Sequence, residues 1–191
     1  ATRPDIIGEK LAKDLEKLQD KLPPFAKTEA SLILKNELGE KTFQSIHEFS
    51  EPIAAASIAQ VHFAKIKNNG VEKEVAIKIL RPSIQKIFNE ELDALMLLAY
   101  IIESTVKKTK RLRLIEIVYL LKEITNIEMD LRFEAAAANE LYENTKNDIG
   151  FIVPKIYWNF TTQKILTLDK IEGIPIRETE KLTKSGIDTK K

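Results

Sequence analysis

Residues 53–80, IAAASIAQVHFAKIKNNGVEKEVAIKIL, decide the fold that the sequence predicts. Within this stretch, residues 59–66 and 74–80 are short runs rich in β-branched or aromatic side chains, as strands are. Asn68-Asn69-Gly70 lies between the two runs and is typical of the tight turn in a strand hairpin. Residues 46–53 have a similar composition. The region therefore predicts three antiparallel strands.

The last of these strands contains Val75-Ala76-Ile77-Lys78, which matches the strand tetrapeptide of protein kinases. Because side chains alternate along a strand, Lys78 is expected on the cleft side, where its ammonium group can meet nucleotide phosphates. The alternative is a lysine whose stem covers apolar surface while its head is solvated. The tetrapeptide alone does not decide between these interpretations.

A loop of small residues separates two of the predicted strands, upstream of this tetrapeptide. Small side chains let the backbone approach phosphates, and protein kinases have glycines at this place. Alanine adopts positive φ less readily than glycine, so we expect a stiffer loop with differently oriented N–H groups. A packing site for small side chains is the alternative. The candidate nucleotide-binding residues are Ala54, Ala55, Ala56, Ser57, Ile58, Ala59, Val61 and Lys78.

A lysine in this position needs a carboxylate partner, because an unpaired ammonium group is costly to desolvate and is not held in place. A helix predicted over residues 114–144 offers Glu128, Asp130 and Glu134. Glu128 continues the spacing of the apolar residues before it, so periodicity alone favours Glu128 as the unusual carboxylate. The alternative is that all three are ordinary surface acids.

The remaining elements make the fold class α+β, with about five antiparallel strands, long helices and an N-terminal helical extension. The predicted helices cover residues 4–22, 28–39, 82–102 and 114–144, and two further strands cover residues 152–158 and 165–170. Thr28 is expected to cap the second helix, Gly39 to end it, and Pro82 to open the third. The division that we expect is an extension over residues 1–44, a lobe over 45–176 and a further segment over 177–191.

Composition removes several classes of function. The 191 residues carry a net charge of +1, which does not indicate bulk nucleic-acid binding. Without cysteine there is no disulfide or thiolate chemistry, and the two histidines, His47 and His62, lack the spacing of a catalytic zinc site. No metal site is predicted within these residues.

The longest apolar stretch, residues 94–102, is too short to cross a bilayer, so we expect a soluble or peripheral protein. One basic cluster could meet anionic lipid headgroups, although a solvated joint between two helices is the simpler interpretation. Its members are Lys107, Lys108, Lys110, Arg111 and Arg113.

Four motifs in this order resemble the UbiB family of atypical kinase-like proteins, which is linked to ubiquinone biosynthesis. They are Pro52-Ile-Ala-Ala-Ala-Ser-Ile-Ala-Gln-Val-His62, Val75-Ala-Ile-Lys78, Glu128-Met-Asp130 and Glu134-Ala-Ala-Ala-Ala-Asn139. Further stretches that resemble the family, such as Thr2-Arg-Pro-Asp-Ile-Ile-Gly8 and Val153-Pro-Lys-Ile-Tyr-Trp158, extend the likeness over nearly the whole chain.

The resemblance implies a kinase-like N-lobe that binds ATP or ADP with magnesium, with the Ala-rich loop in place of a glycine loop. It also implies that Lys78 pairs with Glu134, against the preference of periodicity for Glu128. Glu128 and Asp130 correspond to a family E-x-D element near the nucleotide site. Residues 171–176 resemble the hinge between two kinase lobes.

Two family elements are not found in this sequence: the KxGQ element that precedes Thr2-Arg-Pro-Asp, and the C-lobe with its catalytic Asp and Asn and its metal-binding Asp. The first residue is Ala1, which indicates the interior of a longer protein or a processed product. We therefore expect the N-terminal part of a UbiB-like kinase or ATPase, with the magnesium ligands in the C-lobe. The competing interpretation is a truncated, non-catalytic scaffold of a lipid-biosynthesis complex.

The partners that we expect are a nucleotide and, in a longer protein, membrane lipid or quinone-biosynthesis proteins, without nucleic acid. The expected location is the cytoplasmic side, peripheral at the inner membrane.

Overall fold

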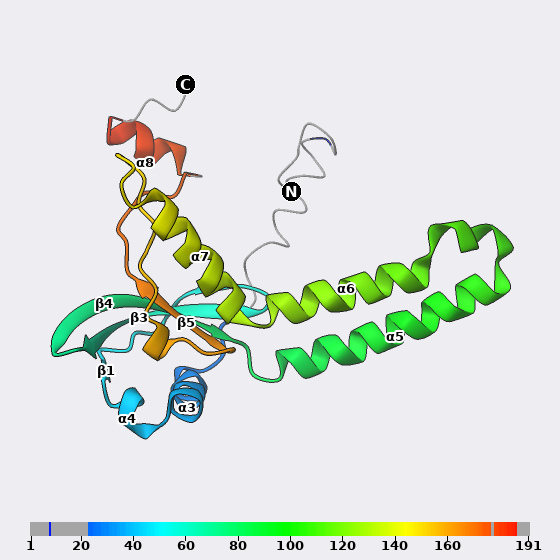
Figure 1. Ribbon diagram of the computed structural model, residues 1–191, viewed down its shortest axis with the longest axis horizontal. Coiled ribbons are helices and arrows are strands. Elements are labelled where there is room, and N and C mark those ends of the chain that lie inside the picture. Colours follow the sequence, from blue (N-terminus) through cyan, green and yellow to red (C-terminus); the bar gives the residue numbers. More distant parts are fainter. Residues whose placement is uncertain (1–7, 9–22, 177, 187–191) are drawn as a thin grey trace.

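A computed structural model describes residue 8 and residues 23–176 and 178–186. The helix expected over residues 4–22 lies outside the described residues. A five-stranded sheet stands at the centre, with helices on both of its faces and a helical hairpin that projects to one side (Figure 1). The helices are α3 (Lys27–Leu38), α4 (Glu40–Phe43), α5 (Ile84–Thr105), α6 (Leu114–Glu128), α7 (Leu131–Thr145) and α8 (Thr179–Lys184), with short 3₁₀ helices η1 (Lys107–Leu112) and η2 (Trp158–Phe160). The strands are β1 (Ile46–His47), β2 (Pro52–Ala55), β3 (Ala59–Asn68), β4 (Val71–Leu80) and β5 (Ile165–Asp169).

The hairpin of β3 and β4 is the longest strand pairing and was correctly predicted from the sequence. It pairs in antiparallel register from Ala59 opposite Leu80 to Asn68 opposite Val71. Asn69 and Gly70 form the turn with φ values of 50° and 81°, the left-handed conformation that a two-residue hairpin turn requires. On its other edge β4 pairs with β5, and β3 pairs with both β1 and β2.

The strand expected over residues 46–53 is instead divided into β1 and β2. The backbone turns at Glu48, where φ is 48°, so one straight strand cannot continue. After this turn, Ser50 forms two hydrogen bonds with the backbone of Phe63 in β3. Its N–H donates to the Phe63 carbonyl at 2.8 Å. Its hydroxyl accepts from the Phe63 N–H at 2.9 Å.

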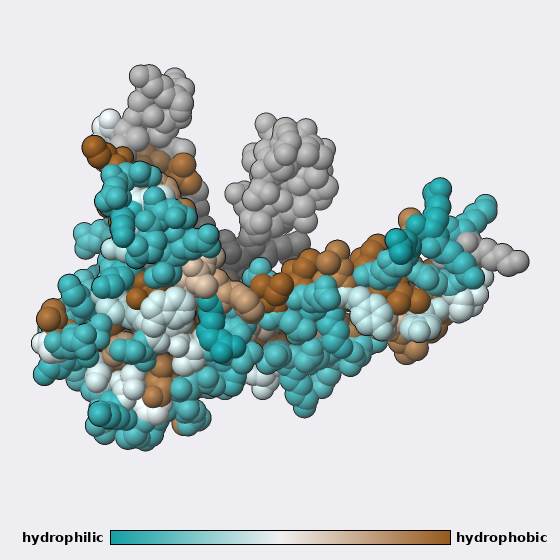
Figure 2. All heavy atoms as spheres, viewed as in Figure 1, coloured by the Kyte–Doolittle hydropathy of each residue, from teal (hydrophilic) through white to brown (hydrophobic). Residues whose placement is uncertain are grey.

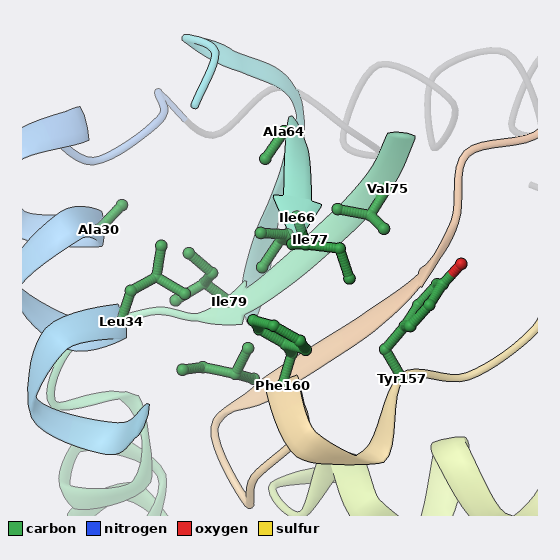
Figure 3. Packing of buried hydrophobic residues seen from close by; sticks show 10 residues of the cluster. Ala30, Leu34, Ala64, Ile66, Val75, Ile77, Ile79, Tyr157 and Phe160 are labelled. Carbon is green, nitrogen blue, oxygen red and sulfur yellow. The ribbon is translucent and has the colours of Figure 1, made fainter. Parts of the chain in front are cut away.

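Alternation along the strands divides the apolar side chains between the two faces of the sheet. One face packs against Ala30 and Leu34 of α3, and Figure 3 shows Leu34 and Phe160 beside Ile79. The second helix of the expected extension therefore shares a core with the sheet. The strand residues of this core are Ala64, Ile66, Val75, Ile77, Ile79 and Ile165. The opposite face packs against α7 through a cluster of Ala59, Leu80, Leu131, Ala135, Ile156 and Leu166.

The single helix predicted over residues 114–144 is wrong, because the chain forms α6 and α7 with a break between them. Asp130 has an extended backbone, with φ of −122° and ψ of 96°, and its carboxylate caps α7 by accepting from the Arg132 N–H. The Leu131 N–H donates to the Gln163 carbonyl at 2.9 Å rather than to the preceding helix. The apolar spacing that leads to Glu128 therefore does not extend to Glu134.

The strand expected over residues 152–158 is also wrong, since only Ile156 bridges to Leu168 before η2 begins. Pro154 has no N–H to donate, so a continuous ladder is interrupted there. Two backbone bonds still attach this segment to β5, from Tyr157 N–H to the Thr167 carbonyl and from Asp169 N–H to the Lys155 carbonyl, both at 2.9 Å.

Helix starts also differ from expectation, whereas one stop was predicted correctly. Residue Ala26 is the N-cap of α3, without a side-chain cap, so Thr28 lies inside the helix. Ser83, not Pro82, immediately precedes α5, and its φ is 58°. Gly39 ends α3 with φ of 77°, and its N–H donates to the Lys35 carbonyl.

Helices α5 and α6 form the projecting hairpin, with a small core of Leu92, Ala99 and Val118. Its tip is η1, which carries the basic cluster except for Arg113, the next residue after Leu112. Apolar side chains remain exposed on both helices, and Figure 2 shows hydrophobic residues along the upper edge of the hairpin. Examples are Leu95, Leu98 and Ile101 of α5 and Ile117, Leu121 and Ile124 of α6. Among the described residues, no helix combines the length and apolar character needed to cross a membrane.

Candidate functional site

Lys78 and Glu134 meet on the face of the sheet that α7 covers. The flanking residues Ile77 and Ile79 point into the opposite core, so alternation directs Lys78 toward α7. Lys78 Nζ donates to Glu134 Oε2 at 2.7 Å, and the two side chains are 26% and 50% exposed. Ala135 lies next to Glu134 and is fully buried, so a small side chain lets the helix approach the sheet. The pair is thus held by packing on both sides and is open to solvent.

An apolar strip surrounds Lys78 on the same face. The register places Val61 of β3, Lys78 of β4 and Leu166 of β5 in one row across the sheet. The neighbouring row on this face contains Ala76 and Leu168. A flat ligand could therefore lie on apolar side chains while its anionic end reaches the ammonium group.

The Ala-rich loop connects β2 to β3 through the turn at residues 56–58. Ala54, Ala56 and Ser57 are exposed, whereas Ala59 is buried as the first residue of β3. The four described non-glycine residues with positive φ are Glu48, Asn69, Ser83 and Arg113, so the loop forms without left-handed backbone. Ala56 N–H donates to the Ala59 carbonyl at 2.8 Å. Within the part of the chain that the structure describes, the N–H groups of Ser57 and Ile58 have no hydrogen-bond acceptor.

Arg81, the residue that follows β4, donates hydrogen bonds to this turn. Its role was not predicted from the sequence. Its Nε donates to the Ala56 carbonyl at 3.0 Å, and both Nη atoms donate to the Pro23 carbonyl at 3.1 Å. Its backbone N–H donates to the Ile58 carbonyl at 2.8 Å. One residue therefore joins both ends of the turn to the chain ahead of α3.

A buried pair in β3, Gln60 and His62, joins this strand to two other segments, and its role was not predicted from the sequence. Gln60 Oε1 accepts from the Phe25 N–H at 3.0 Å, and Gln60 Nε2 donates to the Phe25 carbonyl at 3.2 Å. The Gln60 amide nitrogen can only donate, so His62 Nε2 accepts from it at 2.9 Å. His62 Nδ1 then carries the proton and donates to the Ser50 carbonyl at 2.9 Å.

Burial favours the neutral form of the His62 ring. Burial, the largest cause, lowers the pKa of His62 below its usual 6.5, and the bond to the Ser50 carbonyl opposes that shift only in part. The ring also stacks on Phe49, with centroids 4.3 Å apart. Nothing in a single sequence marks Gln60 or His62 as buried, because their partners are backbone groups of distant segments.

The other two candidate carboxylates lie elsewhere. Glu128 is the exposed last residue of α6, and no cation pairs with it among the described residues. Asp130 is buried, and its two oxygens accept from Arg132 Nε and Nη2 at 2.9 and 2.6 Å. Its hydrogen bond with the Arg132 guanidinium lowers the pKa of the Asp130 carboxyl. Both Asp130 oxygens are thus occupied by the backbone N–H and the guanidinium of Arg132. These hydrogen bonds would have to break before Asp130 could bind a ligand.

Metal ligands are not gathered at this site. In residues 23–176 and 178–186, no group of three or more His, Asp or Glu side chains is close enough together to hold an ion. Asp169, at the end of β5, accepts a hydrogen bond from the Tyr157 hydroxyl. Burial, together with this bond, raises the pKa of Tyr157.

Comparison with known proteins shows the family of the chain. The ABC1 atypical kinase-like domain matches residues 17–191. A probable protein kinase UbiB from Marinobacter nauticus is 35% identical over 189 residues, which cover 98% of this chain and 34% of that protein. Proteins of the same name from Azotobacter vinelandii and Cellvibrio japonicus are 34% and 35% identical, and the matches cover all of this chain and 35% and 34% of theirs. The chain thus spans about a third of the length of the curated relatives it matches. It belongs to the ABC1 family of atypical kinase-like domains, the family that the resemblance to UbiB proteins predicts.

Proposed function

We propose that this chain is the nucleotide-binding lobe of a UbiB-like atypical kinase or ATPase that supports ubiquinone biosynthesis. The observation that carries the proposal is the bond of 2.7 Å between Lys78 and Glu134. The register places Lys78 opposite Val61, which lies opposite Ala54 of the Ala-rich segment. In protein kinases a strand lysine paired with a helix glutamate positions the nucleotide phosphates. The family membership of the chain supports the same role here.

The side chains around Lys78 fit ATP or ADP. Val61, Ala76 and Leu168 offer an apolar surface for the base, and Lys78 offers charge for the phosphates. The N–H groups of Ser57 and Ile58, which have no acceptor among the described residues, suit phosphate oxygens. Magnesium would have to be bound mainly by groups outside the described residues, since these gather no cluster of ligands. Bound magnesium neutralises phosphate charge and supports transfer.

Calorimetry with Mg·ADP and Mg·ATP on the full-length protein tests this proposal. We expect Lys78→Ala to weaken binding by at least about tenfold, because an ion pair with a phosphate is lost. Glu134→Ala should weaken binding less, because it removes only the group that positions the ammonium. Both effects should act on ATP and ADP alike.

Lys164→Ala is the matched control, since Lys164 forms a comparable ion pair of 2.8 Å with Glu37 of α3. If Lys78→Ala bound nucleotide as tightly as the Lys164 variant, the proposed site would be wrong. If the unmodified protein gave no heat at millimolar nucleotide, the non-catalytic scaffold would become the better interpretation.

A further inference from the structure

The turn at residues 56–58 has no glycine, and its position depends on hydrogen bonds from outside the loop. Both of its outer carbonyls, those of Ala56 and Ile58, are bound by Arg81, one by the side chain and one by the backbone N–H. The guanidinium also binds the Pro23 carbonyl with both Nη atoms, so the side chain is fixed at two points. Among the described residues, no carboxylate forms an ion pair with Arg81. Its donors are therefore directed at backbone carbonyls.

The bond to Ala56 has a directional consequence for the next residue. In a trans peptide the carbonyl of one residue and the N–H of the following residue point in opposite directions. Because Arg81 Nε holds the Ala56 carbonyl at 3.0 Å, the Ser57 N–H must point away from Arg81. Ser57 is exposed, and its N–H has no acceptor within the described part of the chain.

We propose that Arg81 is a positioning residue that directs the Ser57 N–H at a nucleotide phosphate by fixing the Ala56–Ser57 peptide plane. This inference rests on the proposed nucleotide function and adds the residue that orients the loop. A glycine loop can adjust its amides to the phosphates through flexible backbone, whereas an alanine loop needs them set in advance. Arg81 supplies that restraint and connects it to Pro23, ahead of α3.

Arg81→Lys tests the proposal, because lysine keeps the charge but lacks the planar fork that binds Ala56 and Pro23 together. We expect Mg·ADP affinity to fall by about tenfold, the effect of losing one well-placed hydrogen bond to a charged group. Affinity for adenosine, which has no phosphates, should stay unchanged. Arg111→Lys at the exposed tip of the projecting hairpin is the matched control and should change neither affinity.

A second measurement needs no nucleotide. The order parameter of the Ser57 N–H, measured by NMR relaxation in the ligand-free protein, should fall in Arg81→Lys while those of the β3 and β4 amides stay unchanged. If Arg81→Lys lowers stability too far, Arg81→Gln, which also lacks the fork that binds Ala56 and Pro23 together, should give a change in the same direction.

The outcomes separate this proposal from the proposed function. Unchanged ADP affinity in Arg81→Lys, beside a loss in Lys78→Ala, would overturn the role of Arg81 and leave the nucleotide site intact. Equal weakening of ADP and adenosine would also overturn it, because Arg81 would then act on the whole lobe. If the unmodified protein bound no nucleotide, the proposed function would fail, and an unchanged Ser57 order parameter in Arg81→Lys would show that Arg81 does not restrain the loop either.

Discussion

At the residue scale, Asp130 stabilises the first turn of α7, and the size of this stabilisation depends on pH. The side chain of Asp130 is 10% exposed, and its ion pair with Arg132 holds the pKa of the carboxyl below the ordinary 3.8. A carboxyl with a lower pKa in the folded state contributes stability above its unfolded pKa. That contribution is lost as the pH falls through the folded pKa.

We expect Asp130→Asn to lower the free energy of unfolding by about 0.5 to 1 kcal/mol at neutral pH, since asparagine still caps the helix but forms no ion pair. The difference in free energy of unfolding between the variant and the unmodified protein should stay constant down to about pH 4. It should shrink below that pH, because a protonated Asp130 is uncharged, as asparagine is. Urea unfolding at a series of pH values measures this difference. A difference that persisted unchanged at the acidic end would contradict the role of the Asp130 charge.

The same scale shows where sequence reasoning is sufficient and where it is not. Lys78 and Glu134 could be named because each belongs to a motif, although spacing alone favoured Glu128. Arg81, Gln60 and His62 could not be assigned roles, because each binds backbone groups far away in the sequence. Every residue has a backbone carbonyl with the same chemistry. No sequence pattern therefore shows that the Pro23 carbonyl is the one that binds Arg81.

At the element scale, α7 is placed by its small residues. Ala135 is fully buried against the sheet, whereas the next residue, Ala136, is exposed on the same helix. A larger side chain at position 135 would force the helix away from β5, and interiors respond to added volume as strongly as to voids. Because Glu134 is the neighbouring residue, such a shift would also move its carboxylate away from Lys78.

We therefore expect Ala135→Leu to destabilise the protein by about 1 to 3 kcal/mol and to weaken nucleotide binding. Ala136→Leu is the control and should leave both quantities nearly unchanged, because its side chain extends into solvent. Thermal unfolding and calorimetry on the two variants measure the effects. Equal behaviour of the two variants would mean that α7 does not depend on close packing at Ala135.

Elements were predictable where the pattern was local. The hairpin of β3 and β4 follows from alternation and from Asn69-Gly70, all within one continuous stretch. The break before α7 was missed because its causes are a side-chain cap at Asp130 and a bond from Leu131 to the distant Gln163 carbonyl. Helical periodicity continues on both sides of such a break and gives no sign of it.

At the scale of the whole molecule, the core is divided into separate clusters. Two of them lie on the two faces of the sheet, and the third, with Leu92, Ala99 and Val118, lies inside the projecting hairpin. Structural units with separate cores can open separately, at different free energies. We expect the hairpin to open before the sheet.

Leu92→Ala tests this division, because Leu92 is 6% exposed in the hairpin core. Loss of a buried leucine costs roughly 2 to 5 kcal/mol, so the amides of α5 and α6 should exchange much faster. Amides of β4 should keep most of their protection. Leu98→Ala, at a position that is 51% exposed, is the control and should change little. Equal loss of protection in β4 and α5 would show a single cooperative unit.

The place where the hairpin joins the sheet has an evolutionary consequence. Leu80, before α5, and Leu131, after α6, belong to the same apolar cluster, so the chain leaves and returns at one point. Insertions or deletions between residues 82 and 129 can therefore change the length of the projection without moving Lys78 or Glu134. Natural selection can vary this appendage, and protein engineers can graft new sequence onto its tip, while the lobe that carries it stays the same.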